Sequence, residues 1–550
     1  MTGSPVDGRP PPTILDLFDE IAGAAPDRPA LLTGDRQRRG AWLRLSFGRL
    51  GARSHALAAG LGARGVRRGA RAALLVPPGE ELVVCALALL RAGAVPILVD
   101  PGIGPRRMRA CLAEARPEAF IGVPRAHLAR RALRWAPTVR QAFSVGARLP
   151  GTDALADLER AGAGVGTAAS ALLPQPPDAA AAILFTSGTT GPPKGVVYRH
   201  PELAAQVRLL KGLYGFAPGD VNVATFAPFA LFGPALGLTT VLVDMDPTRP
   251  ADVDPAKLIA ACAAGSATSL FGSPALLRAV ARHGAGTGDR FPSSLRTVLS
   301  AGAPVPRAVV EDTLAMLPAG ARVATPYGMT EALPVASVDS DELLAVDPAN
   351  DGWATLVGRA APETDVAVIA VHDGPLDILT ATLPQGEVGE VIVRGPQVTH
   401  AYDARPDATR AAKLRWDGRL AHRTGDLGHL DARGRLWFCG RVVDRVVTAD
   451  GPCWPVPCEA VVTAHPHVRR AALVGLGARG SQRPVMVVEC EPSVVPDAAL
   501  TRDLLGRLAD QQHTRGIRAL RYHPGFPVDI RHNAKVDYSR LRAWLEGPGR

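Results

Sequence analysis

Continuous apolar runs alternate with helical patterns along the first two thirds of the chain. Residues 79–101, GEELVVCALALLRAGAVPILVDP, read as an apolar helix, a glycine turn and a buried strand. Residues 229–247, FALFGPALGLTTVLVDMDP, end in a closely similar way. Unbroken apolar strands between helices are typical of parallel sheets covered on both faces. The pattern therefore predicts two similar α/β lobes.

The pattern changes in the last third of the chain. From about residue 386, short β-rich runs such as GEVGEVIVRG and GRLWFCGRVVDRVV alternate with turn residues, which predicts an antiparallel, β-rich third lobe. The final block has two strands, AALVGLG and PVMVVEC, and a helix, DAALTRDLLGRLADQQ. We therefore expect an α/β protein with a large N-terminal domain, residues 1–442, and a small α+β domain, residues 443–550. The Ala/Gly/Pro-rich stretch 161–182 reads as a linker inside the large domain.

Composition limits the class of protein. The chain has 550 residues, 47% of them hydrophobic and 21% charged, which is globular and too long for one core. The net charge is +10, but the arginines are scattered and no basic stripe with aromatics appears, so we expect no nucleic-acid partner. No signal peptide or run of about 20 apolar residues is seen, so we expect a cytoplasmic protein without an integral membrane segment. The seven cysteines form no metal-binding spacing and read as reduced thiols.

Lysine is rare in a chain that uses arginine almost everywhere. Only five lysines occur, and they are Lys194, Lys211, Lys257, Lys413 and Lys535. Lysine is a compact point charge, whereas arginine is a planar fork, so a site that needs a point charge on a phosphate resists replacement by arginine. Lys194 and Lys535 stand in polar loops and are therefore candidates for such sites.

Residues 183–200, ILFTSGTTGPPKGVVYRH, place a Gly/Ser/Thr turn after a short apolar strand. Backbone N–H groups and hydroxyls in such a turn form a concavity that binds phosphate, although the same composition also suits a flexible surface loop. A Walker A loop is excluded, because Pro193 stands where its second glycine should precede Lys194, and Gly195 replaces the hydroxyl that binds Mg²⁺. The loop therefore predicts phosphate binding of another kind.

Three further stretches combine polar residues with turn signals. They are TPYGMTEALP at 325–334, HRTGDLGHLDARGRLWFCGR at 422–441, and DIRHNAKVDYSRL around Lys535. Each alone reads as a plain turn. In this order, together with the loop at 183–200, they resemble the adenylate-forming superfamily of acyl-CoA synthetases, luciferases and peptide-synthetase adenylation domains.

The resemblance implies an AMP-forming ligase that uses ATP and Mg²⁺. It implies that Glu331 and Thr186 hold the metal, that Tyr327 lies by the adenine, and that a mobile C-terminal domain brings Lys535 to the reaction. Asp426 would accept the ribose hydroxyls, and Arg441 would contact the ribose or a phosphate. The phosphate loop would comprise Thr186, Ser187, Gly188, Thr189, Thr190, Gly191 and Lys194. The remaining ATP contacts would come from Gly302, Ala303, Pro304, Gly328, Met329 and Thr330, with residues 301–304 as the floor of the site.

Some stretches depart from the thioester-forming pattern. The hinge position, commonly Asp or Lys, is Val443, and the usual C-terminal Gly-Lys is Ala534-Lys535. These stretches look most like the olefin β-lactone synthetases. That resemblance implies a 2-alkyl-3-hydroxy fatty acid substrate whose β-hydroxyl displaces AMP to close a lactone, and partner enzymes of a hydrocarbon or β-lactone pathway.

The acyl chain needs an apolar pocket, and residues 226–237 are the candidate. Phe229 and Phe232 would line it while Gly233 and Gly237 leave room, although ordinary core packing explains the same stretch equally well.

Two other functions stay open. A fatty acyl-CoA synthetase would pass the acyl group to coenzyme A, which Val443 disfavours because a β-branched residue restricts a hinge. A silent nucleotide-binding protein is the third, and the retention of Lys535 and Glu331 argues against it.

Overall fold

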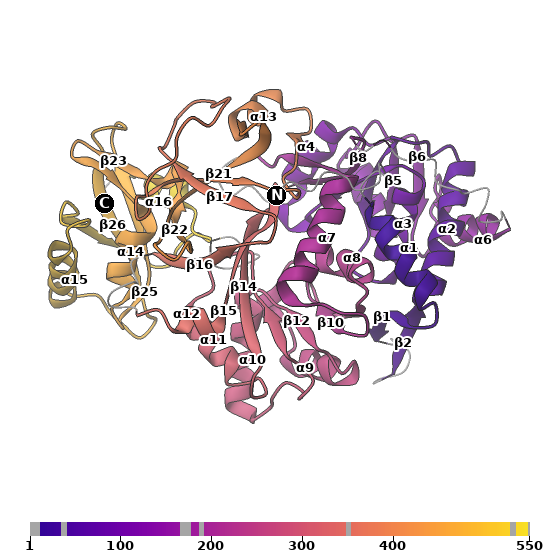
Figure 1. The fold of residues 1–550 in the computed structure, drawn as a ribbon, viewed down its shortest axis with the longest axis horizontal. Coiled ribbons are helices and arrows are strands. Elements are labelled where there is room, and N and C mark those ends of the chain that lie inside the picture. The colour runs from indigo at the N-terminus through magenta and orange to yellow at the C-terminus, as the bar shows by residue number, and fades with distance from the viewer. Residues whose placement is uncertain are drawn as a thin grey trace.

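The computed structural model describes residues 12–34, 41–164, 176, 178–185, 192–347, 354–528 and 535–547. In Figure 1 the first α/β lobe lies on the right, the second at the lower centre, and the C-terminal unit on the left. No helix in these ranges is both long and apolar enough to cross a membrane.

The first lobe is built on an eight-stranded sheet in the order β19-β9-β8-β4-β3-β5-β6-β7. Helix α3 (Glu80–Arg91) is buried continuously from Leu82 to Arg91, which explains why its sequence is apolar on every side. The strands are β3 (Arg71–Leu75), β4 (Val95–Val99), β5 (Ala119–Gly122), β6 (Gln141–Ser144), β7 (Asp153–Ala154), β8 (Ala180–Phe185), β9 (Gly195–Arg199) and β19 (Ala401–Tyr402). The helices are α2 (Phe47–Ala63), α3, α4 (Pro105–Ala115), α5 (Pro124–Ala132) and α6 (Leu155–Ala163).

The second lobe contains the parallel half of a 14-stranded sheet. A layer of helices between the lobes shares one apolar cluster with both sheets, in which Phe18, Leu89 and Phe229 are buried. The strands are β2 (Trp42–Ser46), β1 (Pro29–Gly34), β11 (Thr239–Leu242), β10 (Val221–Ala224), β12 (Ser269–Phe271), β13 (Thr297–Leu299) and β14 (Arg322–Met329). The helices are α1 (Ile14–Ala24), α7 (His200–Tyr214), α8 (Ala227–Leu236), α9 (Pro255–Ala264), α10 (Pro274–Thr287) and α11 (Arg307–Leu314).

The β-rich region continues the same large sheet rather than forming one of its own, because β15 pairs with β16. It also begins earlier than the predicted residue 386, with the antiparallel strands β15, β16 and β17. Mixed runs without strict alternation hid these strands from the sequence pattern. Its elements are β15 (Ala332–Asp339), α12 (Ser340–Leu344), β16 (Thr355–Ala360), β17 (Asp365–Ile369), β18 (Gly389–Arg394), α13 (Pro406–Ala412), β20 (Lys413–Trp416), β21 (Arg419–Leu430) and β22 (Leu436–Arg441).

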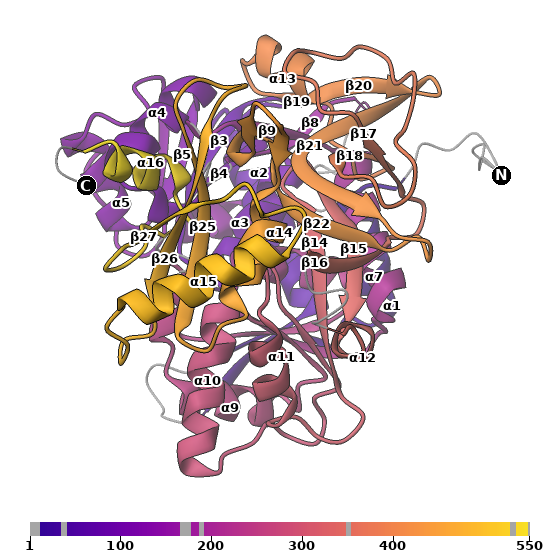
Figure 2. The ribbon, with the colours of Figure 1, turned by 90° about the vertical axis from the view of Figure 1, so that its left-hand side faces the viewer.

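The C-terminal unit has a three-stranded sheet with an apolar cluster on each face. Leu473 and Met486 face α15 in one cluster, while Val474 and Val487 face α16 in the other, as the two-residue period of a strand requires. Figure 2 shows this unit on the side that faces the viewer, above α10 and α11 in that view. Its elements are β23 (Val446–Thr448), β24 (Gly451–Cys453), α14 (Pro455–Thr463), β25 (Val468–Leu476), β26 (Arg483–Cys490), α15 (Ala498–Asp510), β27 (Ala519–Tyr522) and α16 (Tyr538–Leu545).

The predicted fold class is confirmed, with two α/β lobes, a β-rich region and a small α+β unit at the C-terminus. The boundary between residues 442 and 443 stays a prediction, and so does the mobility of the C-terminal unit.

Candidate active site

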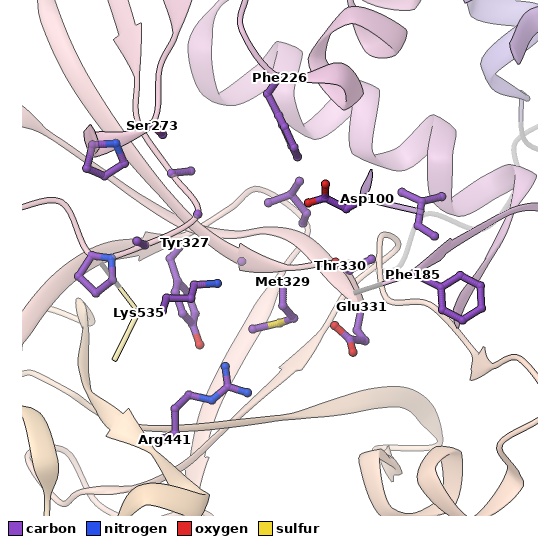
Figure 3. A pocket seen from close by; sticks show the side chains of 18 of the residues that line it. Asp100, Phe185, Phe226, Ser273, Tyr327, Met329, Thr330, Glu331, Arg441 and Lys535 are labelled. Atoms are coloured by element: carbon purple, nitrogen blue, oxygen red, sulfur yellow. The ribbon is translucent and has the colours of Figure 1, made fainter. Parts of the chain in front are cut away.

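A cavity of about 2750 Å³ lies where the two lobes, the β-rich region and the C-terminal unit meet. It opens at the carboxyl ends of parallel strands from both sheets, which is where α/β folds bind their ligands. Figure 3 shows Tyr327, Glu331, Arg441 and Lys535 around this space. Lys194 and Asp426 also line it. The cavity therefore brings together these six candidate residues from distant parts of the sequence.

Asp426 lies in one corner of the cavity with Tyr327 and Arg441. The Tyr327 hydroxyl donates a hydrogen bond to Asp426 Oδ2 at 2.6 Å, and Arg441 Nε lies 3.0 Å from Asp426 Oδ1. Asp426 Oδ1 is buried, and within the described chain it accepts no well-directed hydrogen bond. Burial raises the pKa of Asp426, while the charge of Arg441 and the hydrogen bond from Tyr327 oppose that rise. The corner thus holds an acceptor that suits a ligand hydroxyl.

The local backbone of this corner differs from the sequence prediction of two turns. Tyr327 lies inside β14, and Asp426 lies inside β21, opposite Arg441 on β22. Gly425, at φ +68°, sits where the pairing of β21 with β18 shifts register. A bulge of this kind bends a strand and redirects a side chain without ending the strand. The glycine therefore aims Asp426 into the cavity from within a sheet.

The phosphate loop is only partly described. Thr186, Ser187, Gly188, Thr189, Thr190 and Gly191 lie outside the described residues, so the predictions for them, including the metal role of Thr186, are untested. The flanking strands β8 and β9 pair antiparallel, with Phe185 opposite Gly195. The Nζ atom of Lys194 lies 4.9 Å from the centre of the Tyr402 ring. The two ends of the loop are therefore held side by side at the cavity.

Glu331 lies between β14 and β15, at the tip of the hairpin they form. Its Oε1 atom accepts a hydrogen bond from the Tyr402 hydroxyl at 2.6 Å. Its main-chain oxygen accepts from the Thr399 N–H at 2.9 Å and from the Thr399 hydroxyl at 3.1 Å. The neighbours Gly328, Met329 and Thr330 line the cavity, as do Gly302, Ala303 and Pro304 after β13.

The surroundings of Glu331 fit a magnesium ion. Among the described residues no ion pair within 4 Å neutralises Glu331, and no cluster of three His, Cys, Asp or Glu could hold a metal unaided. Mg²⁺ prefers hard oxygen ligands and is commonly held by one or two carboxylates together with phosphate oxygens and water. A carboxylate on the cavity wall, without an ion-pair partner among the described residues, satisfies that requirement.

Three buried polar residues behind Glu331 and Lys194 were missed at the sequence level. Tyr402 contacts both residues. Burial lowers the pKa of Lys413 to about 8, against the opposing charges of Glu331 and Glu202. His422 is also buried, and burial lowers the pKa of its imidazole well below the usual range. Lys413 could have been found, because it is one of only five lysines.

Lys535 enters the cavity from the C-terminal unit, just before α16. Its positive charge is among the influences that oppose the rise in the pKa of Asp426, and Figure 3 shows its side chain at the cavity that Tyr327 and Arg441 also line. Three residues later, the Tyr538 hydroxyl donates to Glu459 Oε1 on α14 at 2.8 Å. This bond fixes the start of α16 to the rest of the unit and so limits where Lys535 can lie.

The predicted acyl pocket is described in part. Phe229 and Phe232 line the cavity, and the Phe229 ring stacks on Phe271 with centroids 4.3 Å apart. The two glycines act differently from the prediction. A Cβ on Gly233 would lie 2.0 Å from the Thr240 hydroxyl, so Gly233 allows α8 to pack on β11. Gly237 caps α8 at φ +79°. Neither glycine lines the cavity, so their role is packing rather than making room.

The chain has relatives among known proteins. The family model described as AMP-binding enzyme matches residues 18–403. The olefin beta-lactone synthetase of Xanthomonas campestris pv. campestris is 49% identical over 511 residues, which cover 91% of this chain and 90% of that protein. The olefin beta-lactone synthetase of Stenotrophomonas maltophilia is 46% identical over 548 residues, covering 97% of this chain and 98% of that protein.

The similarity extends to solved structures. The ATP-bound structure of MatB from Rhodopseudomonas palustris superimposes with a TM-score of 0.77 at 24% identity, covering 98% of this chain and 100% of that chain. At this identity the match speaks for the fold alone. The family model and the two relatives carry the assignment further, and the chain belongs to the AMP-binding enzyme family, on the branch of the olefin beta-lactone synthetases.

Proposed function

We propose that the protein is an AMP-forming ligase that adenylates a 2-alkyl-3-hydroxy fatty acid and closes the product to a β-lactone. The observation that carries this proposal is the identity of 46 to 49% with two olefin beta-lactone synthetases over nearly the whole chain. The cavity supports it, because the ribose-type corner, the phosphate lysine and Lys535 face one space beside an apolar wall.

Residues of the large domain that line the cavity bind ATP. Asp426 accepts the ribose hydroxyls through its buried Oδ1 atom, while Tyr327 and Arg441 hold the carboxylate in place. The loop at 186–191 and Lys194 take the β- and γ-phosphates. Glu331, with Thr186, would hold Mg²⁺, which when bound neutralises charge on the phosphates.

In the first half-reaction a carboxylate oxygen of the acid attacks the α-phosphorus. The new P–O bond forms as the bond to pyrophosphate breaks, which leaves an acyl-adenylate. Lys535 lies between the carboxylate and the α-phosphate, where its ammonium neutralises the negative charge that builds up in the transition state. No protein nucleophile takes part, so positioning and charge neutralisation supply the catalysis.

In the second half-reaction the β-hydroxyl of the same molecule attacks the acyl carbon. The C–O bond of the four-membered ring forms, the bond to the AMP phosphate breaks, and the hydroxyl proton leaves with the AMP phosphate or to water. An internal nucleophile held in a suitable geometry reaches effective molarities of about 10⁵ M or more, so no external acceptor is required.

Product analysis tests this proposal against the formation of a coenzyme A thioester. A 3-hydroxy acid should give AMP, pyrophosphate and a product lighter than the acid by one water, at the same rate with or without coenzyme A. The 3-deoxy acid should be adenylated and then stall, because its adenylate has no internal nucleophile. A coenzyme A adduct formed efficiently from the deoxy acid would overturn the lactone step and leave only adenylation.

A further inference from the structure

Tyr402 occupies a short strand that brings the β-rich region back to the first lobe. Strand β19 pairs antiparallel with β9, and Tyr402 lies opposite Val196, two residues after Lys194. The side chain is 7% exposed and belongs to the apolar cluster between the lobes. Tyr402 is therefore fixed both by its backbone pairing and by its packing.

The side chain of Tyr402 contacts two candidate ATP-site residues that are far apart in the sequence. The ammonium of Lys194 lies 4.9 Å from the ring centre, within the range of a cation–π interaction. The hydroxyl donates to Glu331 Oε1 at 2.6 Å, the short distance expected for a charged acceptor. One rigid ring thus has a cation near its face and an anion at its tip.

We propose that Tyr402 is a positioning residue that sets the phosphate lysine and the metal carboxylate in register before ATP binds. The inference rests on the proposed adenylation. The cation–π contact holds the Lys194 ammonium at the cavity wall. The hydroxyl fixes one oxygen of Glu331, and within the described residues the other oxygen, Oε2, accepts no hydrogen bond and is left for a metal.

The two contacts separate on substitution, because they use different parts of the side chain. Tyr402→Phe removes the hydroxyl and keeps the ring, so only Glu331 loses its partner. Tyr402→Leu removes both contacts. Tyr214→Phe is the matched control, since it removes a partly buried hydroxyl that bonds Ser337 at 3.1 Å and lies outside the cavity.

Calorimetric titration of ATP without the acid, with and without Mg²⁺, measures the two effects apart from turnover. In Tyr402→Phe, the gain in ATP affinity on adding Mg²⁺ should shrink about 10- to 100-fold, as for one lost hydrogen bond to a charged group. Affinity without Mg²⁺ should be unchanged. In Tyr402→Leu, the affinity without Mg²⁺ should also fall, by about 2- to 5-fold for one cation–π contact. Tyr214→Phe should match the wild type.

A double-mutant cycle with Lys194→Ala completes the test. Once Lys194 is absent, Tyr402→Leu and Tyr402→Phe should bind ATP equally without Mg²⁺, because the ring no longer has a cation to hold. Two results would overturn the positioning role. One is an equal loss of ATP affinity without Mg²⁺ in both Tyr402 variants while Lys194 is present. The other is that the losses from the Tyr402 and Lys194 substitutions are additive. Failure of the wild type to form an adenylate would instead remove the proposed function, so the two failures are distinguishable.

Discussion

Asp426 and Glu331 each accept a hydrogen bond from a tyrosine hydroxyl at 2.6 Å, yet their surroundings differ. Asp426 is buried and has Arg441 at ion-pair distance, so its charge is already balanced within the protein. Glu331 is partly buried, and in the described part of the chain no cation lies within 4 Å of it. A balanced carboxylate suits neutral hydroxyls such as those of ribose, whereas an unbalanced one suits a metal.

A third pair of the same kind, Tyr538 and Glu459, lies in the C-terminal unit. Glu459 also accepts from the Leu473 N–H at 2.9 Å, and burial raises its pKa to about 7. No cation forms an ion pair with it among the described residues. The three pairs share one hydrogen bond, but only Asp426 has an ion-pair partner among the described residues, which supports the different roles proposed above for Asp426 and Glu331.

The largest expected effect on the rate of adenylate formation comes from Lys535, the cation that approaches Asp426 from the C-terminal unit. Lys535→Ala should lower single-turnover adenylate formation by about 10²- to 10³-fold while leaving ATP affinity nearly unchanged, because Lys535 acts on charge that develops in the transition state. Lys257→Ala is the control, since its side chain is 69% exposed. A loss of tenfold or less would remove Lys535 from the mechanism.

Glu331→Gln should give the next largest loss. The amide keeps the shape and can still accept from Tyr402, but it lacks the charge that a metal requires, so we expect a fall of about 10²-fold in rate, equivalent to roughly 2.7 kcal/mol. The concentration of Mg²⁺ needed for half-maximal rate should also rise, and a titration of Mg²⁺ at saturating ATP measures it. A variant with the wild-type requirement for Mg²⁺ would refute the metal role.

Sequence patterns could predict the fold class because long apolar strands and helices dominate the core. They could also place Tyr327, Glu331, Asp426, Arg441 and Lys535, because their short motifs resemble a known family. The sequence did not identify Tyr402 or His422 as site residues, because the contacts of each depend on partners that only the folding of β19 and β21 brings together. The glycines of α8 were misread for the same reason. Only the packed structure shows that Gly233 faces Thr240 and not the cavity.

Asp426→Asn should weaken ATP binding by about 10- to 100-fold, as expected for a lost hydrogen-bond partner with a charge. The amide offers a donor where an acceptor is needed, and it leaves Arg441 without its counter-charge. Deoxygenated nucleotides identify the cause. The wild type should bind ATP more tightly than 2′-deoxy-ATP or 3′-deoxy-ATP, and the variant should discriminate less. Undiminished discrimination would place the ribose elsewhere.

Tyr327→Phe should have a smaller effect on the same corner. Asp426 keeps Arg441 and loses one donor, so the apparent KM for ATP should rise about 5- to 10-fold with kcat little changed. Steady-state kinetics at saturating acid measures the change. A fall in kcat with KM unchanged would mean that Tyr327 acts on the reaction and not on binding.

The smallest expected effect is that of Glu459 on the stability of the folded protein. The folded-state pKa of Glu459, about 7, lies above its ordinary value of 4.5, so the folded protein binds the extra proton between these values. Stability from this group is complete below about pH 4.5 and is lost as the pH rises through about 7.

The variant Glu459→Gln tests this pH dependence, because its side chain is neutral at every pH and can still accept a hydrogen bond from Tyr538. We therefore expect the variant to melt a few degrees above the wild type at pH 8 and no higher at pH 5. Thermal unfolding at the two pH values decides this, and an equal difference at both would mean that Glu459 carries a charge in the folded state, balanced like that of Asp426.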